Sequence, residues 1–289
     1  MKTDIKSPGT SVSGWLEWGM SELTFLGERE ARRECEQILE TLGGISRTEL
    51  YLGTSLSSLL FSRFSQGIEK RKNRFPLAYF LGKAFFWEDE FEVEEGVFIP
   101  RSETEILIES FLKQSGFQPL DGFHFLDLGT GSGNIAATMA KLFPKAHGTA
   151  SDLSEKALRV AKRNANRLGV GERIKGIRAD GLKSFAPESF DAILSNPPYI
   201  ASPDWAGLEP EVHREPRLAL DGGKEGLDFY QKIMRELAGL KRGGSLWVEI
   251  GWGQCEAVQS LFEKKGFRSV RIFKDFNGIE RVVTGIFNG

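Results

Sequence analysis

The sequence predicts an α/β fold, a doubly wound parallel sheet joined through a β-hairpin to a small amino-terminal helical bundle. Three observations predict it. Apolar, strand-like segments alternate with segments of helical periodicity over most of the chain, the first 75 residues show helical spacing without strands, and a short alternating segment lies between these parts. The expected domains are residues 1–75, 76–98 and 99–289.

The amino-terminal part is expected to form several helices. Apolar residues recur at helical spacing around Trp15, from Ala31 to Leu42 and from Leu56 to Ile68. Gly43-Gly44 is typical of the end of the second helix. Ser46-Arg47-Thr48-Glu49 matches a capping box and therefore predicts the start of another helix.

A basic run, Lys70-Arg71-Lys72-Asn73-Arg74, follows the last of these helices. It has two interpretations, a phosphate-binding patch or a solvated helix end stabilised by the helix dipole, and we favour the second. The first 75 residues hold 11 Lys and Arg against 10 Asp and Glu, which leaves 27 against 30 for the remainder. Neither part is strongly basic.

The segment Phe85 to Phe98 alternates apolar and polar residues and predicts a hairpin that links the two domains. Ser102-Glu103-Thr104-Glu105 follows it, and the S-x-x-E pattern indicates the cap of a helix that continues through Ile106 and Leu112.

The stretch Asp127-Leu128-Gly129-Thr130-Gly131-Ser132-Gly133 follows a strand-like segment, Phe123 to Leu126, and precedes helical periodicity from Ile135. Strand, tight glycine turn and helix are the order that cofactor loops of the nucleotide-binding type require. The glycine spacing is shorter than the dinucleotide fingerprint, which seats a pyrophosphate. The loop therefore suits a cofactor without phosphates, and a purely structural turn is the alternative.

Two further acidic residues come at strand ends. Asp152 follows the expected strand His147 to Ser151, about twenty residues beyond the loop, where a carboxylate can accept hydrogen bonds from both ribose hydroxyls. Asp180 ends the strand Ile174 to Ala179. Each aspartate could instead accept hydrogen bonds from turn amides, an alternative that weighs most for Asp127.

Asn196-Pro197-Pro198-Tyr199 ends the apolar run Phe190 to Leu194. The prolines lack N–H donors and cannot continue the strand, so the Asn196 side-chain oxygen and the Pro197 carbonyl are left as neighbouring acceptors beside an aromatic ring. Together they can accept both hydrogens of one planar NH2 group, while Tyr199 offers a stacking face. This predicts a pocket for a nitrogen nucleophile, and the alternative is an ordinary Asn-Pro turn.

The chain resembles class I methyltransferases that use S-adenosylmethionine, and among them the release-factor glutamine methyltransferases of the PrmC/HemK type. The resemblance covers roughly residues 76 to 289. Besides the glycine loop and the NPPY stretch, it is carried by Pro76-Leu77-Ala78-Tyr79, Leu81-Gly82, Phe98-Ile99-Pro100-Arg101-Ser102-Glu103-Thr104-Glu105, Glu215-Pro216-Arg217-Leu218-Ala219-Leu220, Asp221-Gly222-Gly223-Lys224-Glu225-Gly226-Leu227, Glu249-Ile250-Gly251 and Asn277-Gly278-Ile279-Glu280-Arg281. Ser102 stands where the family usually has proline.

The resemblance implies a Rossmann-like methyltransferase sheet whose last strand is antiparallel, formed by the pair Ser269 to Lys274 and Arg281 to Phe287. It implies S-adenosylmethionine as cofactor and methylation of the glutamine amide in the GGQ tripeptide of peptide chain release factors. The expected catalytic and substrate-binding residues are Asn196, Pro197, Pro198, Tyr199 and Arg101. The expected cofactor-binding residues are Asp127, Gly129, Thr130, Gly131, Ser132, Gly133, Asp152, Asp180, Gly181 and Asn196, with the glycines at the methionine end, Asp152 at the ribose and Asp180 with Gly181 beside adenine.

The roles of Arg101 and of the segment after the NPPY stretch are less certain from the sequence pattern. Arg101 could contact the partner protein, pin a loop, or form an ion pair with Glu103 or Glu215. Ile200 to Gly223 is a long irregular segment, and we expect it to form a wall or lid over the acceptor, with Trp205 shielding the site from water.

Composition restricts the functional classes. The 289 residues are 40% hydrophobic and 27% charged, with a net charge of −2, which argues against a nucleic-acid partner. Two distant cysteines and three scattered histidines predict no metal site, and no apolar stretch approaches the roughly 18 residues of a membrane span. The amino terminus, Met1 to Gly9, has no apolar signal core. We expect a cytoplasmic monomer.

Three functions remain for comparison. The first is glutamine methylation of release factors. The second is methylation of an exocyclic amine on a nucleic-acid base, which the NPPY stretch also permits but which requires a basic groove. The third is cofactor binding without catalysis, which an intact NPPY stretch disfavours.

Overall fold

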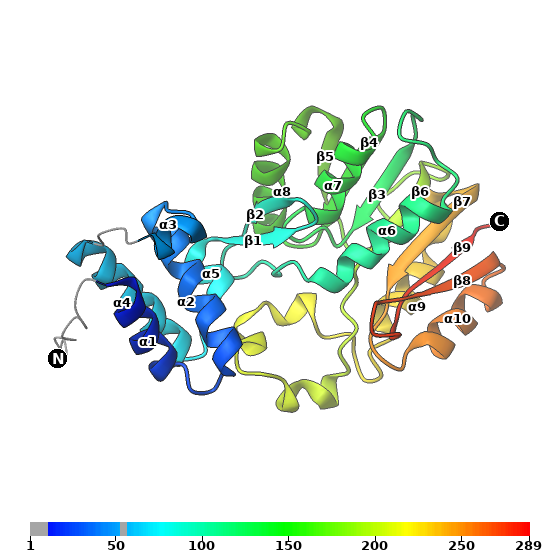
Figure 1. Ribbon diagram of the computed structural model, residues 1–289. Coiled ribbons are helices and arrows are strands. Elements are labelled where there is room, and N and C mark those ends of the chain that lie inside the picture. Colours follow the sequence, from blue (N-terminus) through cyan, green and yellow to red (C-terminus); the bar gives the residue numbers. More distant parts are fainter. Residues whose placement is uncertain (1–10, 53–56) are drawn as a thin grey trace. The chain divides into compact units, whose positions relative to one another are not determined.

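The computed structural model describes residues 11–52 and 57–289. Its chain divides into two compact units. The described residues up to Gly82, together with Pro210–Arg214, form the smaller unit, and Lys83–Glu209 with Glu215–Gly289 form the larger one (Figure 1). Leu56 and the Met1 to Gly9 segment, both used in the sequence analysis, lie outside the described residues.

The smaller unit is helical, as the sequence predicts. Its helices are α1 (Val12–Glu22), α2 (Glu28–Gly43), α3 (Arg47–Tyr51), α4 (Ser58–Lys72) and α5 (Leu77–Leu81). Trp15, Ile38 and Phe64 bring α1, α2 and α4 together in one buried apolar cluster. Gly44 ends α2 in the left-handed conformation, and the capping box of α3 is present, since Ser46 and Glu49 each accept a backbone hydrogen bond at the helix start.

The basic run at the end of α4 is a solvated helix end only in part, because Lys70, Lys72 and Asn73 are exposed whereas Arg71 is buried and Arg74 is half-buried. Arg71 is 3% exposed and donates two hydrogen bonds to Glu34, from Nε to Oε2 at 2.6 Å and from Nη2 to Oε1 at 3.0 Å. Arg71 and Arg74 also form ion pairs with Glu211, which belongs to the same unit. The favoured interpretation therefore fails for Arg71, because the Glu34 carboxylate, distant in sequence, holds its guanidinium in the interior with two hydrogen bonds.

Replacing Arg71 by methionine should lower the free energy of unfolding of this unit by about 3–5 kcal/mol, because it leaves the buried Glu34 carboxylate without a partner. Urea unfolding would measure it. Arg74→Met is the matched control, because it loses a part-exposed ion pair with Glu211 and a cation–π contact with the Phe25 ring, and about 1–2 kcal/mol is expected. The double variant Arg71→Met with Glu34→Met should recover most of the loss; a loss equal to that of Arg71→Met alone would contradict this account.

The larger unit holds a two-stranded hairpin and a seven-stranded sheet. The hairpin pairs β1 (Lys83–Phe86) with β2 (Asp89–Glu92). The sheet has the order β5-β4-β3-β6-β7-β9-β8. Its strands are β3 (His124–Leu128), β4 (His147–Asp152), β5 (Ile174–Arg178), β6 (Phe190–Ser195), β7 (Leu240–Glu249), β8 (Arg268–Lys274) and β9 (Glu280–Ile286).

Five neighbouring strands of the sheet pair in parallel, in the order β5, β4, β3, β6 and β7. β9 runs antiparallel to both β7 and β8, so the antiparallel ending is confirmed. Successive residues point to opposite faces: Phe125 and Leu194 join one buried cluster, whereas Leu126 and Ile193 join the other. Each face is covered by helices, as Figure 1 shows. These are α6 (Glu105–Gln114), α7 (Asn134–Leu142) and α8 (Glu155–Arg167) on one side, and α9 (Asp228–Arg235) and α10 (Cys255–Lys264) on the other.

The S-x-x-E cap at Ser102 is not formed. A short 3-10 turn covers Ser102–Thr104, and α6 begins at Glu105 without a side-chain cap. The Glu105 carboxylate instead accepts a hydrogen bond from the Trp87 backbone N–H at 2.7 Å, which ties the hairpin to α6. No helix among residues 11–52 and 57–289 is long and apolar enough to span a membrane.

Candidate active site

The sheet order reverses between β3 and β6, because the chain continues from β3 outward to β4 and β5 and then returns to the other side of β3. In doubly wound sheets a crevice opens at such a point, at the carboxyl ends of the strands. Asp127 pairs with Leu194, and the Ser195 hydroxyl donates a hydrogen bond to the Leu128 carbonyl at 2.6 Å. Continued by two residues, this register sets Gly129 level with Asn196. The topology therefore brings the two sequence motifs together.

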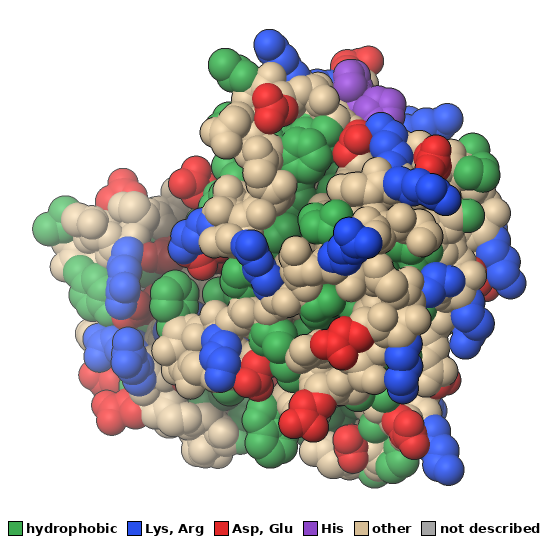
Figure 2. Space-filling view, turned by 90° about the vertical axis from the view of Figure 1, so that its right-hand side faces the viewer, with side chains coloured by type: hydrophobic (Ala, Val, Ile, Leu, Met, Phe, Trp, Pro, Cys, Tyr) green, Lys and Arg blue, Asp and Glu red, His purple; other side chains and the backbone are tan. Residues whose placement is uncertain are grey.

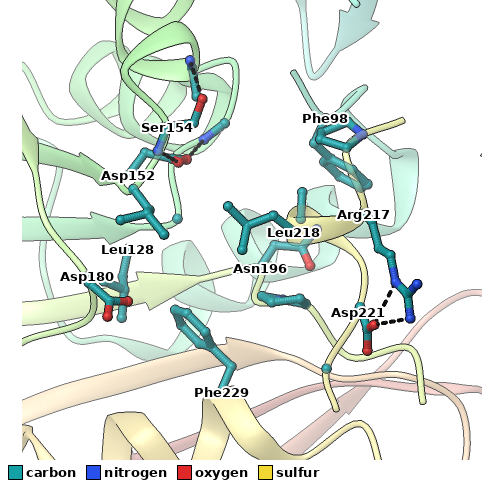
Figure 3. A pocket seen from close by; sticks show the side chains of 18 of the residues that line it. Phe98, Leu128, Asp152, Ser154, Asp180, Asn196, Arg217, Leu218, Asp221 and Phe229 are labelled. Carbon is teal, nitrogen blue, oxygen red and sulfur yellow. Dashed lines mark hydrogen bonds and ion pairs between the residues drawn. The ribbon is translucent and has the colours of Figure 1, made fainter. Parts of the chain in front are cut away.

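A cavity of about 720 Å³ lies at these strand ends. Figure 3 shows Asp152, Ser154, Leu128 and Asp180 along one side, and Phe98, Arg217 and Asp221 along the other, with Asn196 and Leu218 between them. Gly129, Gly131 and Gly181 belong to the wall as well. The space thus has two halves, one built from the ends of β3, β4 and β5 and the other from the segments around residues 98 and 218, and Asn196 borders both.

The glycine loop is folded by its own backbone hydrogen bonds. The N–H groups of Gly129 and Thr130 donate to the Ser151 carbonyl, each at 2.8 Å, and that of Gly131 donates to Asp152 Oδ2 at 2.9 Å. The Gly133 N–H donates to the Thr130 carbonyl at 2.8 Å. Because four N–H groups of the loop already have protein acceptors, they are not available to a pyrophosphate, which agrees with the short glycine spacing.

Gly129 and Gly133 both have positive φ, +77° and +82°, but differ in the space around them. A Cβ on Gly133 would lie 2.8 Å from the Ala161 Cβ, whereas a Cβ on Gly129 meets no atom within 4 Å and borders the cavity. Gly133→Ala should therefore lower the melting temperature clearly. Gly129→Ala should cost only the roughly 1–2 kcal/mol of the left-handed backbone and mainly weaken S-adenosylmethionine binding. Thermal unfolding and calorimetric titration would separate the two; equal effects on both quantities would contradict the assignment.

Asp127 is fully buried and lies behind the loop. Its Oδ2 accepts hydrogen bonds from the Thr130 hydroxyl at 2.6 Å and from the Ala136 N–H at 3.0 Å, and so fixes the loop to the start of α7. Its Oδ1 has no hydrogen-bond partner in the described part of the chain, and burial raises the pKa of this carboxyl to about 7. Asp127 is not among the residues of the cavity wall, and neither are Thr130 and Ser132.

Asp152 and Asp180 both line the cavity. The Asp152 carboxylate accepts the Gly131 and Ser154 N–H groups, one on each oxygen, and burial raises the pKa of this carboxyl. Each oxygen keeps a lone pair for a ligand hydroxyl. Asp180 forms an ion pair with Lys232 of α9, and Gly181 follows it with a φ of +78°. Phe229, also on α9, adds an aromatic ring to the same side of the wall.

The four NPPY residues are divided between the cavity and the interior. Asn196 and Pro198 belong to the cavity wall, whereas Pro197 and Tyr199 do not. The Asn196 Nδ2 donates to the Thr104 Oγ1 at 2.8 Å, and the Tyr199 hydroxyl is directed to Glu249 Oε1 at 3.4 Å. Neither the Asn196 Oδ1 nor the Pro197 carbonyl accepts a hydrogen bond from the described residues. Two neighbouring acceptors without a partner among the described residues therefore lie at the strand end, and the one from Asn196 belongs to the cavity wall.

Arg101 forms an ion pair with Glu215, whose other oxygen accepts the Ile99 N–H at 3.0 Å. Of the alternatives considered for Arg101, the ion pair with Glu215 is thus present, and it pins the segment that follows the NPPY stretch. This segment is less irregular than predicted, because 3-10 turns cover Ser202–Gly207, Val212–Arg214 and Arg217–Ala219. Its Trp205 is not part of the cavity wall and lies under the Arg217 guanidinium instead, 4.9 Å from the ring centre.

Phe98, Phe229, Leu218 and Glu249 were not predicted from the sequence to have a role in the site. Phe98 and Leu218 stand inside the motifs that carry the family resemblance, so their position there was the available signal. Phe229 lies just beyond such a motif, and nothing in the sequence distinguishes it from a core aromatic.

S-adenosylmethionine fits this cavity. The glycine loop leaves open space where a side chain would stand, a carboxylate with free lone pairs faces the cavity at Asp152, and the loop N–H groups that a pyrophosphate needs are already used. The sheet is doubly wound with an antiparallel last strand, and at the point where its strand order reverses it carries a cofactor loop that does not suit a phosphate. The NPPY stretch follows at the neighbouring strand end. Together these features define a class I S-adenosylmethionine-dependent methyltransferase.

The comparisons with known proteins agree. The model of the methyltransferase small domain matches residues 91–206, and that of the PrmC N-terminal domain matches residues 14–82. The release factor glutamine methyltransferase of Caulobacter vibrioides is 39% identical, covering 96% of this chain and 97% of the relative, and that of Bacillus subtilis is 36% identical, covering 94% and 96%. The chain belongs to the release factor glutamine methyltransferase family.

Solved structures support the fold alone. A methyltransferase from Pyrococcus furiosus superposes with a TM-score of 0.51 at 20% identity, covering 69% of this chain and 89% of that one. The catalytic domain of hMettl16, solved with an RNA hairpin, superposes with a TM-score of 0.54 at 14% identity, covering 83% and 86%.

Proposed function

We propose that this enzyme transfers a methyl group from S-adenosylmethionine to the side-chain amide nitrogen of the glutamine in the GGQ tripeptide of peptide chain release factors. The observation that carries the proposal is the Asn196 carboxamide, which borders both halves of the cavity and lies level with the glycine loop. Family membership supplies the substrate class, because the relatives are release factor glutamine methyltransferases.

The two acceptors at the strand end suit an amide. An amide nitrogen is a poor nucleophile because its lone pair is delocalised into the carbonyl. Asn196 Oδ1 and the Pro197 carbonyl accept its two hydrogens, hold the NH2 group in one plane and stabilise the positive charge that develops on nitrogen. The cofactor supplies an electrophilic methyl group on a sulfonium sulfur. The residues of the wall align the nitrogen with that methyl and exclude water, and orientation supplies most of the rate.

A general base is not required before the attack. A bound S-adenosylmethionine would supply the methyl group and keep the C–S electron pair on its sulfur, and the methylated amide nitrogen, positively charged, would lose its proton readily to water. No histidine belongs to the described wall of the cavity. In the cofactor half, we propose that the glycine loop takes the methionine end, Asp152 the ribose hydroxyls, and Asp180 with Gly181 the adenine.

Release factors are the partners in this proposal, and a direct nucleic-acid partner is not part of it. Lys and Arg side chains are interspersed with Asp and Glu over the face in Figure 2, and the net charge is −2, whereas a polyanion groove gathers basic residues in one stripe. We propose that the enzyme acts as a monomer. We place the enzyme in the cytoplasm, where translation ends.

Radiolabelled S-adenosylmethionine tests the proposal. Label should enter a purified release factor and should be absent from a release factor whose GGQ glutamine is replaced by alanine. Total RNA and genomic DNA are the parallel acceptors. Labelling of nucleic acid without labelling of release factor would favour the base-amine reaction, and the absence of label from all three would contradict catalysis.

A further inference from the structure

The Asn196 carboxamide has two different ends, and only its oxygen suits the proposed reaction. An acceptor NH2 group must meet hydrogen-bond acceptors, so Oδ1 has to face the substrate and Nδ2 has to face away. The two ends have nearly the same size, so packing alone does not select between them. Some other group must therefore set the orientation. The inference below rests on the proposed function, because it concerns how that acceptor is held.

A chain of hydrogen bonds leads from Asn196 into the interior. The Asn196 Nδ2 lies 2.8 Å from Thr104 Oγ1, and Thr104 Oγ1 lies 2.6 Å from Glu249 Oε2. Thr104 and Glu249 are each 1% exposed. They come from distant elements, the 3-10 turn before α6 and the last residue of β7, and neither is among the residues of the cavity wall.

The direction of this chain follows from the chemistry of its last member. A carboxylate can only accept hydrogen bonds, so the single hydroxyl hydrogen of Thr104 must point to Glu249. The Thr104 oxygen then offers only lone pairs to Asn196, which turns the NH2 end toward Thr104 and the oxygen toward the cavity. We propose that Thr104 and Glu249 are positioning residues that fix the orientation of the Asn196 carboxamide and so present its oxygen to the substrate amide.

The orientation depends on the charge of Glu249. A protonated Glu249 could donate to Thr104, which would free the Thr104 hydroxyl to donate to Asn196 Oδ1 and would let the carboxamide turn its NH2 group toward the substrate. Burial raises the pKa of Glu249 to about 7, so this protonation takes place near neutral pH. The groups that face Glu249 are Thr104, Glu103, Tyr199, Arg281 and Tyr230, whose hydroxyl donates to the Glu249 carbonyl at 2.8 Å. The Glu103 charge raises this pKa, whereas the Thr104 and Tyr199 hydrogen bonds and the Arg281 charge lower it.

Thr104→Val and Thr104→Ser form a matched pair for the test. Valine keeps the shape of threonine but removes the hydroxyl, and serine keeps the hydroxyl. We expect kcat for release factor methylation to fall by roughly ten- to a hundredfold in Thr104→Val and by less than about threefold in Thr104→Ser. The dissociation constant of S-adenosylmethionine, measured by calorimetry, should change less than about threefold in both. Equal losses of kcat in the two variants, or an unchanged kcat in Thr104→Val, would overturn the proposal.

The pH profile adds a readout that a merely structural role would not move. Wild-type kcat should fall as the pH is lowered through about 7, because protonation of Glu249 releases the carboxamide. Asp127, whose pKa is also raised to about 7, could produce the same limb, and Glu249→Gln decides between them. Glutamine is neutral and can either accept from Thr104 or donate to it, so this variant should have a kcat several-fold lower and should lack the acid limb. An acid limb that persists in Glu249→Gln would overturn the proposal.

Stability separates positioning from structural support. Folding raises the pKa of Glu249 above its value of 4.5 in the unfolded chain, so folding favours the neutral carboxyl. That contribution is fully present below pH 4.5 and is lost as the pH rises through about 7. Glu249→Gln should therefore melt no lower than wild type at pH 8 although its kcat is lower. A lower melting temperature at pH 8 would instead indicate structural support. An inactive wild type would refute the proposed function, whereas an active wild type with unaffected variants would refute only this inference.

Discussion

Asn196→Ala is expected to lower kcat for release factor methylation by on the order of 10²–10³-fold, the cost of removing one well-placed group that stabilises developing charge. The affinity for S-adenosylmethionine should stay within about threefold of wild type. Alanine removes the acceptor oxygen at the boundary of the two cavity halves but leaves the hydrogen bonds of the glycine loop untouched. Single-turnover labelling and calorimetric titration of the cofactor would measure the two quantities.

Two further variants show whether the loss belongs to the acceptor itself. Ser195→Ala removes the neighbouring hydrogen bond to the Leu128 carbonyl and so disturbs the same strand ends without changing the carboxamide; kcat should fall only a few-fold. Asn196→Gln keeps a carboxamide but extends it by one methylene, and its kcat should fall by at least about tenfold, because a displacement near 1 Å at a reacting centre costs up to a hundredfold. If Asn196→Ala lost as much affinity for S-adenosylmethionine as it lost rate, the assignment of Asn196 as the acceptor for the substrate amide would be contradicted.

The sequence predicted that the glycine loop and the NPPY stretch lie together, because each is local to a single strand end. Gly129 and Asn196 each follow an apolar strand directly, and parallel strands end at a common edge, so two separate motifs could be brought together without knowledge of tertiary contacts. The sheet topology then added their shared register. Tyr199 shows the limit of this reasoning, because being next to Asn196 in sequence does not set the direction of its ring, and its hydroxyl is directed to the buried Glu249.

Side-chain partners distant in sequence could not be predicted. Thr104 and Glu249 are 145 positions apart, and their hydrogen bond exists only because the turn before α6 packs against the end of β7. The same cause explains the failed cap at Ser102 and the basic run: Glu105 bonds to Trp87, and Arg71 bonds to Glu34 across two helices. The capping box at Ser46 was predicted correctly because both of its partners lie within four residues. A local capping pattern is therefore predictable from sequence where no distant group competes for its side chains, as at Ser46, and fails where one does, as at Glu105.

Asp152→Ala is the reverse of the Asn196 variant. We expect it to weaken binding of S-adenosylmethionine, and of the product S-adenosylhomocysteine, by on the order of a hundredfold, since it removes two charge-assisted hydrogen bonds to the ribose hydroxyls at about 1.5–3 kcal/mol each, less what water returns. At saturating S-adenosylmethionine, kcat of Asp152→Ala should lie within about tenfold of the wild-type value. The structure adds a complication, because the same carboxylate accepts the Gly131 and Ser154 N–H groups and thus also shapes the glycine loop.

A ligand-side change separates these two roles of Asp152. The 2′,3′-dideoxy analogue of S-adenosylhomocysteine lacks both ribose hydroxyls. Wild type should therefore bind this analogue about as weakly as Asp152→Ala binds S-adenosylhomocysteine itself. In a thermodynamic cycle of the two proteins and the two ligands, the coupling free energy between Asp152 and the hydroxyls should be at least about 2 kcal/mol. If Asp152 acted only through the loop, the variant would lose the same factor in affinity for both ligands and the coupling would be near zero. Calorimetric titration of all four combinations measures this directly. The charge of Asp152 sets the pH dependence as well: burial raises the pKa of this carboxyl, so affinity for the natural ligand should decline as the pH falls through that raised value, while affinity for the dideoxy analogue should decline less.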